Sequence, residues 1–144
     1  MYVVMSFKPV YAHEIVDGVK DCEVRTYFSP LSSGDVVLIY SSSPEKAFIG
    51  EFVISNVITG YSKDIALYLR SKCKMFDEIN WRFFNERYAL SRRRLILLEI
   101  GDVIRYRRSV SLYEVRRYVT TFRPPMSYVY VDYSFVKLIR SLSA

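Results

Sequence analysis

The chain has 144 residues, of which 51% are hydrophobic and 25% are charged, and its net charge is +6. This length suits one domain with one core, 1–144, and the composition excludes an intrinsically disordered chain. No apolar run approaches the ~20 residues of a membrane span. The first ten residues, MYVVMSFKPV, also lack the basic start and long apolar stretch of a signal peptide. We therefore expect an intracellular, cytoplasmic protein that makes no membrane contact.

The chain has two cysteines, Cys22 and Cys73, and one histidine, His13. These residues are too few for a usual zinc site, and the sequence requires no cofactor and no metal. A disulfide between the two cysteines is open, but a reducing compartment disfavours it. We therefore predict that Cys22 is a free thiol in the core.

Basic residues are concentrated at the C-terminal end. Residues 1–91 carry ten Lys and Arg against eleven Asp and Glu, whereas residues 92–144 carry eleven against four. A concentrated basic field raises the local concentration of polyanions, which favours nucleic acid as a partner. The alternative is a solvated surface of the thermophile type. The absence of glutamine and the excess of fourteen arginines over seven lysines suit a thermophile as well.

Periodicity and punctuation predict eleven elements in the order β-α-β-β-β-α-α-β-α-β-α. Pro9 suits the first turn of the first helix and Gly18 its end, while Gly50 suits a bulge or a close approach. The sequence SLYE, from Ser111 to Glu114, predicts a capping box. The expected ranges are 2–7, 8–20, 22–28, 36–40, 47–58, 63–72, 75–90, 94–108, a short helix from 111, 122–131 and 134–142.

This order predicts an α+β fold. Three strands run together with short connections, and helices are interspersed elsewhere. Such an arrangement favours a mixed or mostly antiparallel sheet that curls into a small β-barrel flanked by helices.

The stretch GVKDCEVR, residues 18–25, places an acid close to two bases. Read as a strand, it puts Lys20, Cys22 and Val24 on one face, and Glu23 and Arg25 on the other. A surface ion pair between Glu23 and Arg25 would be worth only ~0–1 kcal/mol. The other interpretation is a binding or catalytic site.

Familiar catalytic motifs are missing from the sequence. It contains no phosphate-binding glycine loop, no dinucleotide fingerprint and no serine-elbow motif. His13 is the only imidazole for any triad. Catalysis would therefore use lysine, carboxylate or tyrosine chemistry.

Three segments in order resemble the ASCH domain family, a PUA-like group. The segment 5–25 is similar to the family opening, Gly-x-Lys-x-x-Glu-x-Arg, with Gly18, Lys20, Glu23 and Arg25 at the four positions. The segment GDVVLIYSSSPEKAFIGEFVI resembles the next block, and RPPMSYVYV resembles a late segment of small archaeal members. The helical middle, roughly 60–92, matches less clearly.

The resemblance implies a PUA-like barrel with a cleft between the barrel and the first helix. It also implies binding of RNA or a modified base. Some members resemble ribonucleases or amidohydrolases that act on modified cytidine. In the amidohydrolase pattern a lysine corresponds to Lys20, but a threonine takes the place of Glu23, and this departure argues against amidase chemistry.

The candidate ligand-binding residues combine charge, hydroxyls and aromatic rings. Arg25 can form paired hydrogen bonds with a phosphate or a base edge, and Glu23 can accept from an exocyclic amine or hold Arg25 in place. Aromatic rings are candidates for base stacking. The full set is Lys8, Arg25, Ser41, Ser42, Arg123 and Ser127, with Tyr27, Trp81 and Tyr128 as the aromatic members.

Three functions remain open. The first is RNA binding, in which the cleft holds a nucleotide and the basic C-terminal third holds the backbone. The second is a hydrolase acting on RNA or a nucleoside, with Lys20 and Glu23 as its catalytic acid–base pair. The third is a protein-interaction module that forms an oligomer through a helix face of Trp81, Phe84 and Tyr88.

Overall fold

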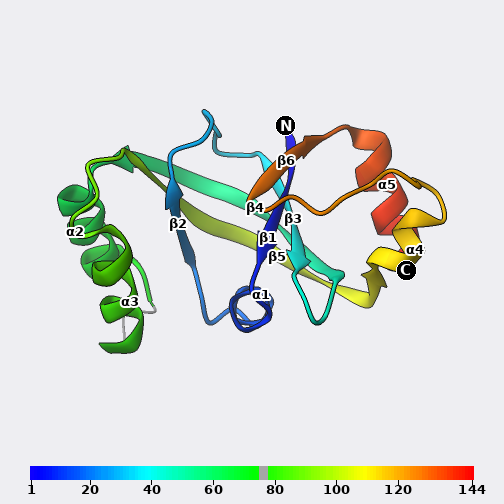
Figure 1. Cartoon of the computed structure of the whole chain (residues 1–144), viewed down its shortest axis with the longest axis horizontal. Helices are drawn as coiled ribbons and strands as arrows, with labels where there is room; N and C mark the ends of the chain where they lie inside the picture. The colour runs from blue at the N-terminus through cyan, green and yellow to red at the C-terminus, as the bar shows by residue number, and fades with distance from the viewer. Residues whose placement is uncertain (75–77) are drawn as a thin grey trace.

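The computed structural model of the chain describes residues 1–74 and 78–144. A curled six-stranded sheet forms its centre, and helices cover one face and both ends of the sheet (Figure 1). The elements follow the predicted order: β1 (Tyr2–Phe7), α1 (Pro9–Val16), β2 (Cys22–Thr26), β3 (Val36–Ser41), β4 (Ala47–Gly60), α2 (Ser62–Lys72), α3 (Glu78–Tyr88), β5 (Leu95–Ser111), α4 (Leu112–Arg116), β6 (Tyr128–Val131) and α5 (Tyr133–Leu142).

The sheet has the strand order β2-β5-β4-β3-β1-β6. Only β1 and β3 pair in parallel among the described strands, and the other neighbours are antiparallel. The predicted α+β fold with a mostly antiparallel sheet is confirmed, and the sheet is a half-barrel. Its two edges, β2 and β6, come from opposite ends of the chain.

The two longest strands, β4 and β5, form the backbone of the sheet. The register shifts near Gly50, and a Cβ at this glycine would lie 2.5 Å from the carbonyl oxygen of Ile104 and 2.8 Å from Val16 of α1. The close approach of β5 and α1 therefore excludes a side chain here, as the sequence predicted. The segment that carries α2 and α3 connects the end of β4 to the start of β5 (Figure 1).

Three apolar clusters correspond to the three places where helices meet the sheet. The first lies under α1 and includes Ile15 and Phe52, and the second packs α4 and α5 against Phe48. The third joins α2 and α3 to β2 and β5 through Leu69 and Phe84. Burial of these side chains is the main favourable contribution to folding.

Local punctuation agrees with the sequence at several ends. Pro9 lies in the first turn of α1, and Gly18 adopts a φ of +76° just after its last turn. Ser111 and Glu114 form the predicted capping box of α4, and Asp132 caps α5. The predicted helix 75–90 is observed over 78–88, and its residues 75–77 lie outside the described residues.

One prediction about the core is wrong. Cys22 and Cys73 are joined by a disulfide, so Cys22 is not a free thiol. Folding brings the start of β2 next to the end of α2, which places the two Cα atoms 6.0 Å apart.

None of the helices that the structure describes is long and apolar enough to cross a lipid bilayer.

Candidate functional site

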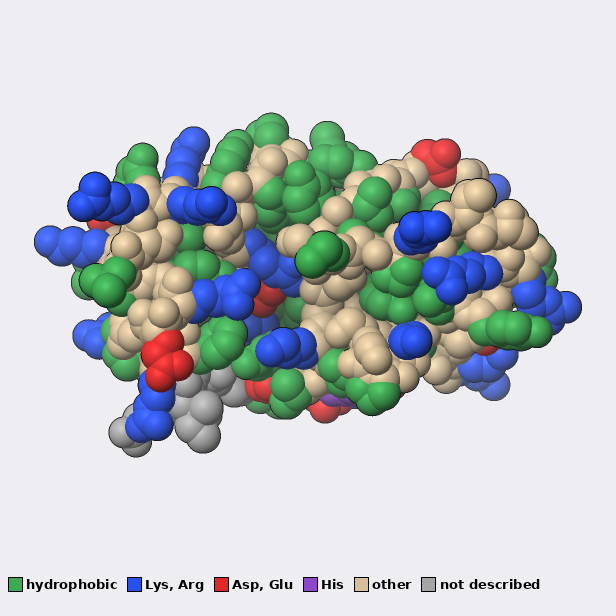
Figure 2. All heavy atoms as spheres, viewed as in Figure 1, with side chains coloured by type: hydrophobic (Ala, Val, Ile, Leu, Met, Phe, Trp, Pro, Cys, Tyr) green, Lys and Arg blue, Asp and Glu red, His purple; other side chains and the backbone are tan. Residues whose placement is uncertain are grey.

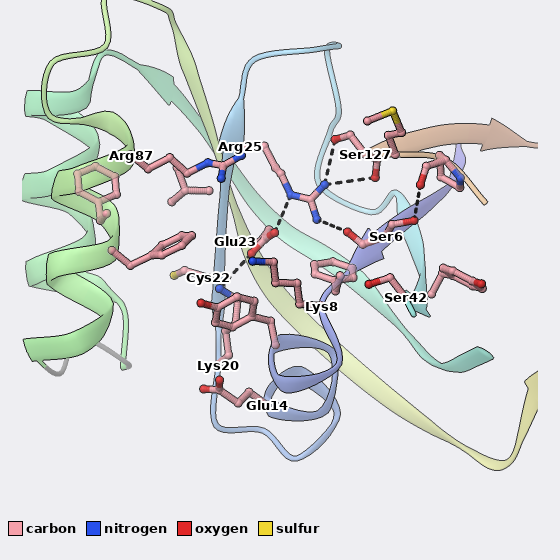
Figure 3. Close-up of a pocket in the computed structure, with 18 of the residues that line it drawn as sticks. Ser6, Lys8, Glu14, Lys20, Cys22, Glu23, Arg25, Ser42, Arg87 and Ser127 are labelled. Atoms are coloured by element: carbon pink, nitrogen blue, oxygen red, sulfur yellow. Dashed lines mark hydrogen bonds and ion pairs between the residues drawn. The ribbon is translucent and has the colours of Figure 1, made fainter. Parts of the chain in front are cut away.

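A cleft of ≈ 680 Å³ opens between the first helix, the sheet edge and α3 (Figure 3). One wall is α1, the opposite wall is α3, and β2 forms the floor between them. The segment 124–127 and the loop after β3 border the remaining side. The cleft predicted beside the first helix is therefore present, with α3 as a second wall that the sequence did not predict.

Three charged side chains form a network at the floor of the cleft. The ammonium nitrogen of Lys20 lies 3.0 Å from Oε1 of Glu23, and Nε of Arg25 donates to Oε2 at 2.7 Å. Glu23 is 8% exposed. Each oxygen of this buried carboxylate thus faces its own cation (Figure 3).

The environment of Glu23 shifts its pKa. Burial alone raises the pKa, but the charges and hydrogen bonds of Lys20 and Arg25 outweigh this effect and lower it below the ordinary value. Glu23 is therefore an ionised acceptor at neutral pH and not a proton donor.

Arg25 makes four hydrogen bonds within the protein. Besides Glu23, its Nη1 donates to the carbonyl oxygen and the hydroxyl of Ser127 at 3.2 and 3.0 Å, and its Nη2 donates to the carbonyl oxygen of Ser6 at 2.8 Å. The guanidinium carbon also lies 5.0 Å from the centre of the Phe7 ring. The geometry favours the interpretation that Glu23 holds Arg25 in place, with Arg25 joining β1, β2 and the segment 124–127.

The backbone before β2 explains the position of Lys20. The strand begins at Cys22, and the amides of Val19 and Lys20 donate to the carbonyl oxygen of Glu14 at the end of α1. Lys20 therefore belongs to the helix end and not to the strand. The prediction that a strand would put Lys20 on the face opposite Glu23 is wrong for this reason.

The structure brings some of the predicted ligand residues to the cleft and leaves others away from it. Lys8, Ser42 and Ser127 line the cleft with the charged network. Ser41 is fully buried beside it. The remaining candidates lie outside the cleft lining: Arg123, Tyr27, Trp81 and Tyr128. Tyr27 contacts Arg94, Trp81 stacks with Phe84 and Arg70, and Tyr128 stacks on Phe28.

The cleft lining also includes residues that were not among the predicted site residues, among them Tyr11, Lys46, Phe83 and Arg87. The rings of Tyr11 and Phe83 lie 6.1 Å apart and bring the two helical walls together. Helical spacing was the available signal, because the N-cap residue Lys8 and the α1 residues Tyr11 and Glu14 recur every three residues. No short-range pattern places α3 opposite α1.

The ASCH domain model matches residues 5–124. The chain belongs to the ASCH domain family. No protein among the curated sequences matches it.

Solved structures share the fold of this ASCH domain at low sequence identity. The ASCH protein of Zymomonas mobilis has a TM-score of 0.83 and 21% identity, covering 98% of this chain and 94% of that one. The N-terminal domain of McrB from Staphylothermus marinus has a TM-score of 0.61 and 16% identity, covering 97% and 93%. A Pseudomonas putida protein has a TM-score of 0.64 and 15% identity over the full length of both chains. These similarities support the fold.

The disulfide of the ASCH domain lies in the cleft wall. Both Cys22 and Cys73 line the cleft, where they tie β2 to the end of α2. Tyr88 of α3 also reaches β2, since its hydroxyl donates to the carbonyl oxygen of Val24 at 3.4 Å. The disulfide thus fastens the floor to the end of α2, and the Tyr88 hydrogen bond joins α3 to the same strand.

The aromatic face of α3, formed by Trp81, Phe84 and Tyr88, packs in the core. Phe84 and Tyr88 are 4% and 7% exposed and pack with Trp81 in the third cluster. Phe84 and Tyr88 are therefore not available for the predicted oligomer face, and Trp81 is partly buried. The neighbouring Phe83, which is 41% exposed, faces the cleft.

The basic residues of the C-terminal third have two kinds of surroundings. Some are held by the ASCH domain itself: Arg105 pairs with Asp17, Arg108 with Glu114, and Arg140 with the buried Glu51. Others extend into solvent, among them Arg107, Arg116, Arg117 and Arg123, and Figure 2 shows basic side chains over the α4 end of the molecule. Only the second group is free to attract a polyanion.

Proposed function

We propose that this ASCH domain binds RNA and holds one unpaired nucleotide, with either an ordinary or a modified base, in the cleft. The observation that carries the proposal is the combination of a buried charged network with exposed cations and aromatic rings in one cleft. Its volume of ≈ 680 Å³ lies within the range of small-molecule sites, ~300–1,000 Å³.

The floor of the cleft suits the polar edge of a base. An ionised carboxylate offers about four lone-pair directions, so Glu23 can accept from an exocyclic amine while Lys20 and Arg25 stay in place. The rings of Tyr11 and Phe83 suit stacking with a base, which is worth ~1–3 kcal/mol per base.

The rim of the cleft suits the phosphates. Lys8, Lys46 and Arg87 are exposed, and within the described part of the chain none of them forms an ion pair with a carboxylate. Each is therefore available for a phosphate oxygen, and release of counterions would make the affinity depend on salt.

A hydrolase is the second candidate, because the 3.0 Å contact of Lys20 with Glu23 is the geometry of an acid–base pair. The lowered pKa of Glu23 makes it a weak base, and Arg25 occupies its other oxygen. We therefore rank RNA binding above hydrolysis.

We propose a cytoplasmic location, which suits an RNA partner. Stable disulfides inside cells are characteristic of hyperthermophiles, and the glutamine-free, arginine-rich sequence is of the thermophile type. Together these features favour a thermophilic source.

The test is equilibrium binding of a labelled, unstructured RNA at two salt concentrations, with the length of the RNA checked in the same samples. Arg87→Ala removes a cleft cation, and Arg82→Ala removes an equal charge from the same helix outside the cleft. We expect Arg87→Ala to weaken binding several-fold. It should also reduce the salt slope, that is, the slope of the logarithm of the binding constant against the logarithm of the salt concentration, by about 0.7. Arg82→Ala should change neither.

Two results would count against RNA binding as proposed. Equal effects of Arg87→Ala and Arg82→Ala would mean that the cleft does not hold the RNA. Shortened RNA with the wild type and intact RNA with Lys20→Met would instead favour the hydrolase.

A further inference from the structure

A second hollow of ≈ 460 Å³ adjoins the cleft on its α4 side. It lies between the loop that follows β3 and the helix α4, and its lining residues are Pro44, Glu45, Lys46, Ser111, Leu112, Tyr113, Arg116 and Arg117. Lys46 and Leu112 line both the cleft and this hollow. The two cavities therefore lie side by side, with Lys46 and Leu112 between them.

The second hollow is basic. Lys46, Arg116 and Arg117 are exposed, and none of them forms an ion pair among the described residues. Arg116 is oriented by its Nε, which donates to the carbonyl oxygen of Phe122 at 3.1 Å. Glu45 is the acidic residue of this lining, and its Oε1 is hydrogen-bonded to Nε2 of His13 at 2.8 Å, at the side of α1.

Lys46 occupies an unfavourable backbone conformation. Its φ is +51°, and it is the one residue other than glycine with a positive φ in the described chain. Glycine or asparagine adopts this conformation at lower cost than lysine. A lysine at the junction of the two cavities therefore costs stability, which is understandable if its ammonium group has a ligand.

An aromatic ring accompanies the cations. Tyr113 lines the second hollow and is 77% exposed. An exposed ring beside unpaired cations is the combination found in grooves that track single-stranded nucleic acid, because bases stack on the ring while the cations follow the backbone.

We propose that the second hollow is a subsite for the sugar–phosphate backbone of nucleotides that flank the one in the cleft. Lys46 would contact the phosphate at the junction, Arg117 the next phosphate along the chain, and Tyr113 would stack with a flanking base. The proposal rests on the proposed RNA binding, and it adds a direction in which the strand leaves the cleft.

The test measures affinity against RNA length, using labelled oligouridylates of two, four and eight nucleotides. Wild-type affinity should rise from the two-mer to the eight-mer. Arg117→Ala should lower the affinity of the eight-mer several-fold more than that of the two-mer, and should reduce the eight-mer salt slope by about 0.7. Lys137→Ala, which removes an equal charge from α5 outside both cavities, is the matched control.

Lys46→Gly separates binding from folding. Glycine relieves the positive φ, so the midpoint temperature of unfolding should stay equal or rise while the affinity of the eight-mer falls. A parallel loss of stability and affinity would contradict the role given to Lys46.

The outcomes also separate the two proposals. The second subsite would be overturned by an eight-mer that binds no tighter than the two-mer, or by equal effects of Arg117→Ala and Lys137→Ala. Neither result would contradict the proposed nucleotide site in the cleft. Failure of every oligonucleotide to bind, together with capture of an acidic peptide, would overturn both proposals.

Discussion

Arg25 and Ser127 lie 102 residues apart and are joined by two hydrogen bonds, from Nη1 to the carbonyl oxygen at 3.2 Å and to the hydroxyl at 3.0 Å. The amide of Ser6 donates to the same carbonyl oxygen at 3.0 Å. The hydroxyl of Ser6 donates to the carbonyl oxygen of Pro125 at 2.6 Å. These bonds attach the segment 124–127 to the sheet. The border of the cleft is thus fixed by the same arginine that neutralises Glu23.

Arg25→Ala should therefore destabilise the whole cleft. It leaves the buried carboxylate of Glu23 with one cation and releases Ser127 and Ser6. Loss of one partner of a buried charge pair costs about 3–5 kcal/mol, and we expect about 3 kcal/mol from urea unfolding. The affinity of this variant for RNA should fall together with its free energy of unfolding.

Ser127→Ala is the matched partial change, because it removes the hydroxyl acceptor and keeps the carbonyl oxygen. This change should lower the free energy of unfolding by about 0.5–1.5 kcal/mol. Arg25→Lys should not restore the wild-type free energy of unfolding, since a lysine has no planar group to reach three partners. Full rescue by lysine would contradict the role of Arg25 as a joint.

The stability of the protein should depend on the ionisation of Glu23 at acid pH. The folded pKa lies below the ordinary value of 4.5, so Glu23 stabilises the fold above that pH. The contribution disappears as the pH falls through the folded pKa, because the unfolded chain then binds a proton first. Urea unfolding of the wild type from pH 7 to pH 3 measures this dependence.

Glu23→Gln isolates the contribution of this carboxylate. Glu45 and Asp132 also have lowered pKa values and remain in the variant. The difference in unfolding free energy between the wild type and E23Q should be largest near neutral pH and shrink below about pH 4.5. A difference that stays constant over the range would show that the charge of Glu23 is not stabilising.

The disulfide should contribute strongly to stability. It closes a separation of 51 residues, for which the chain-entropy relation gives about 4 kcal/mol. Reduction of the wild type should lower the free energy of unfolding by about this amount, while the same reductant should not affect the Cys22→Ser, Cys73→Ser double variant. Detection of two free thiols in the native, unreduced protein would contradict the bond.

The aromatic side chains of α3 should matter for folding and not for assembly. Phe84→Ala should cost about 3–5 kcal/mol, since Phe84 is buried in the third cluster. Light scattering of Trp81→Ser over a range of concentrations should give the wild-type mass. A change of mass in this variant would restore the oligomer face as a hypothesis.

The order of the elements could be predicted from the sequence because strands and helices have local signals. Alternation in β2, the apolar run of β5, Pro9 at the start of α1 and the capping box at Ser111 all act over a few residues. The family pattern then placed Lys20, Glu23 and Arg25 together, which the structure bears out as a contact network.

The rest of the site depends on long-range contacts. Arg25 meets Ser127 across 102 residues, and Cys22 meets Cys73 across 51, and no local pattern signals either pair. The position of Lys20 was mistaken because the end of α1 extends into the stretch that alternates like a strand. The second wall of the cleft, α3, lies in the segment that resembles the family least.

Photo-crosslinking tests the central claim most directly. The wild-type protein is bound to a short RNA that carries 4-thiouridine, irradiated and digested, and the crosslinked peptides are identified by mass spectrometry. We expect crosslinks to the cleft walls, in peptides that contain Tyr11 or Phe83. Crosslinks confined to peptides that contain Arg92 and Arg93, which lie outside the cleft lining, with none in the cleft, would contradict RNA binding in the cleft.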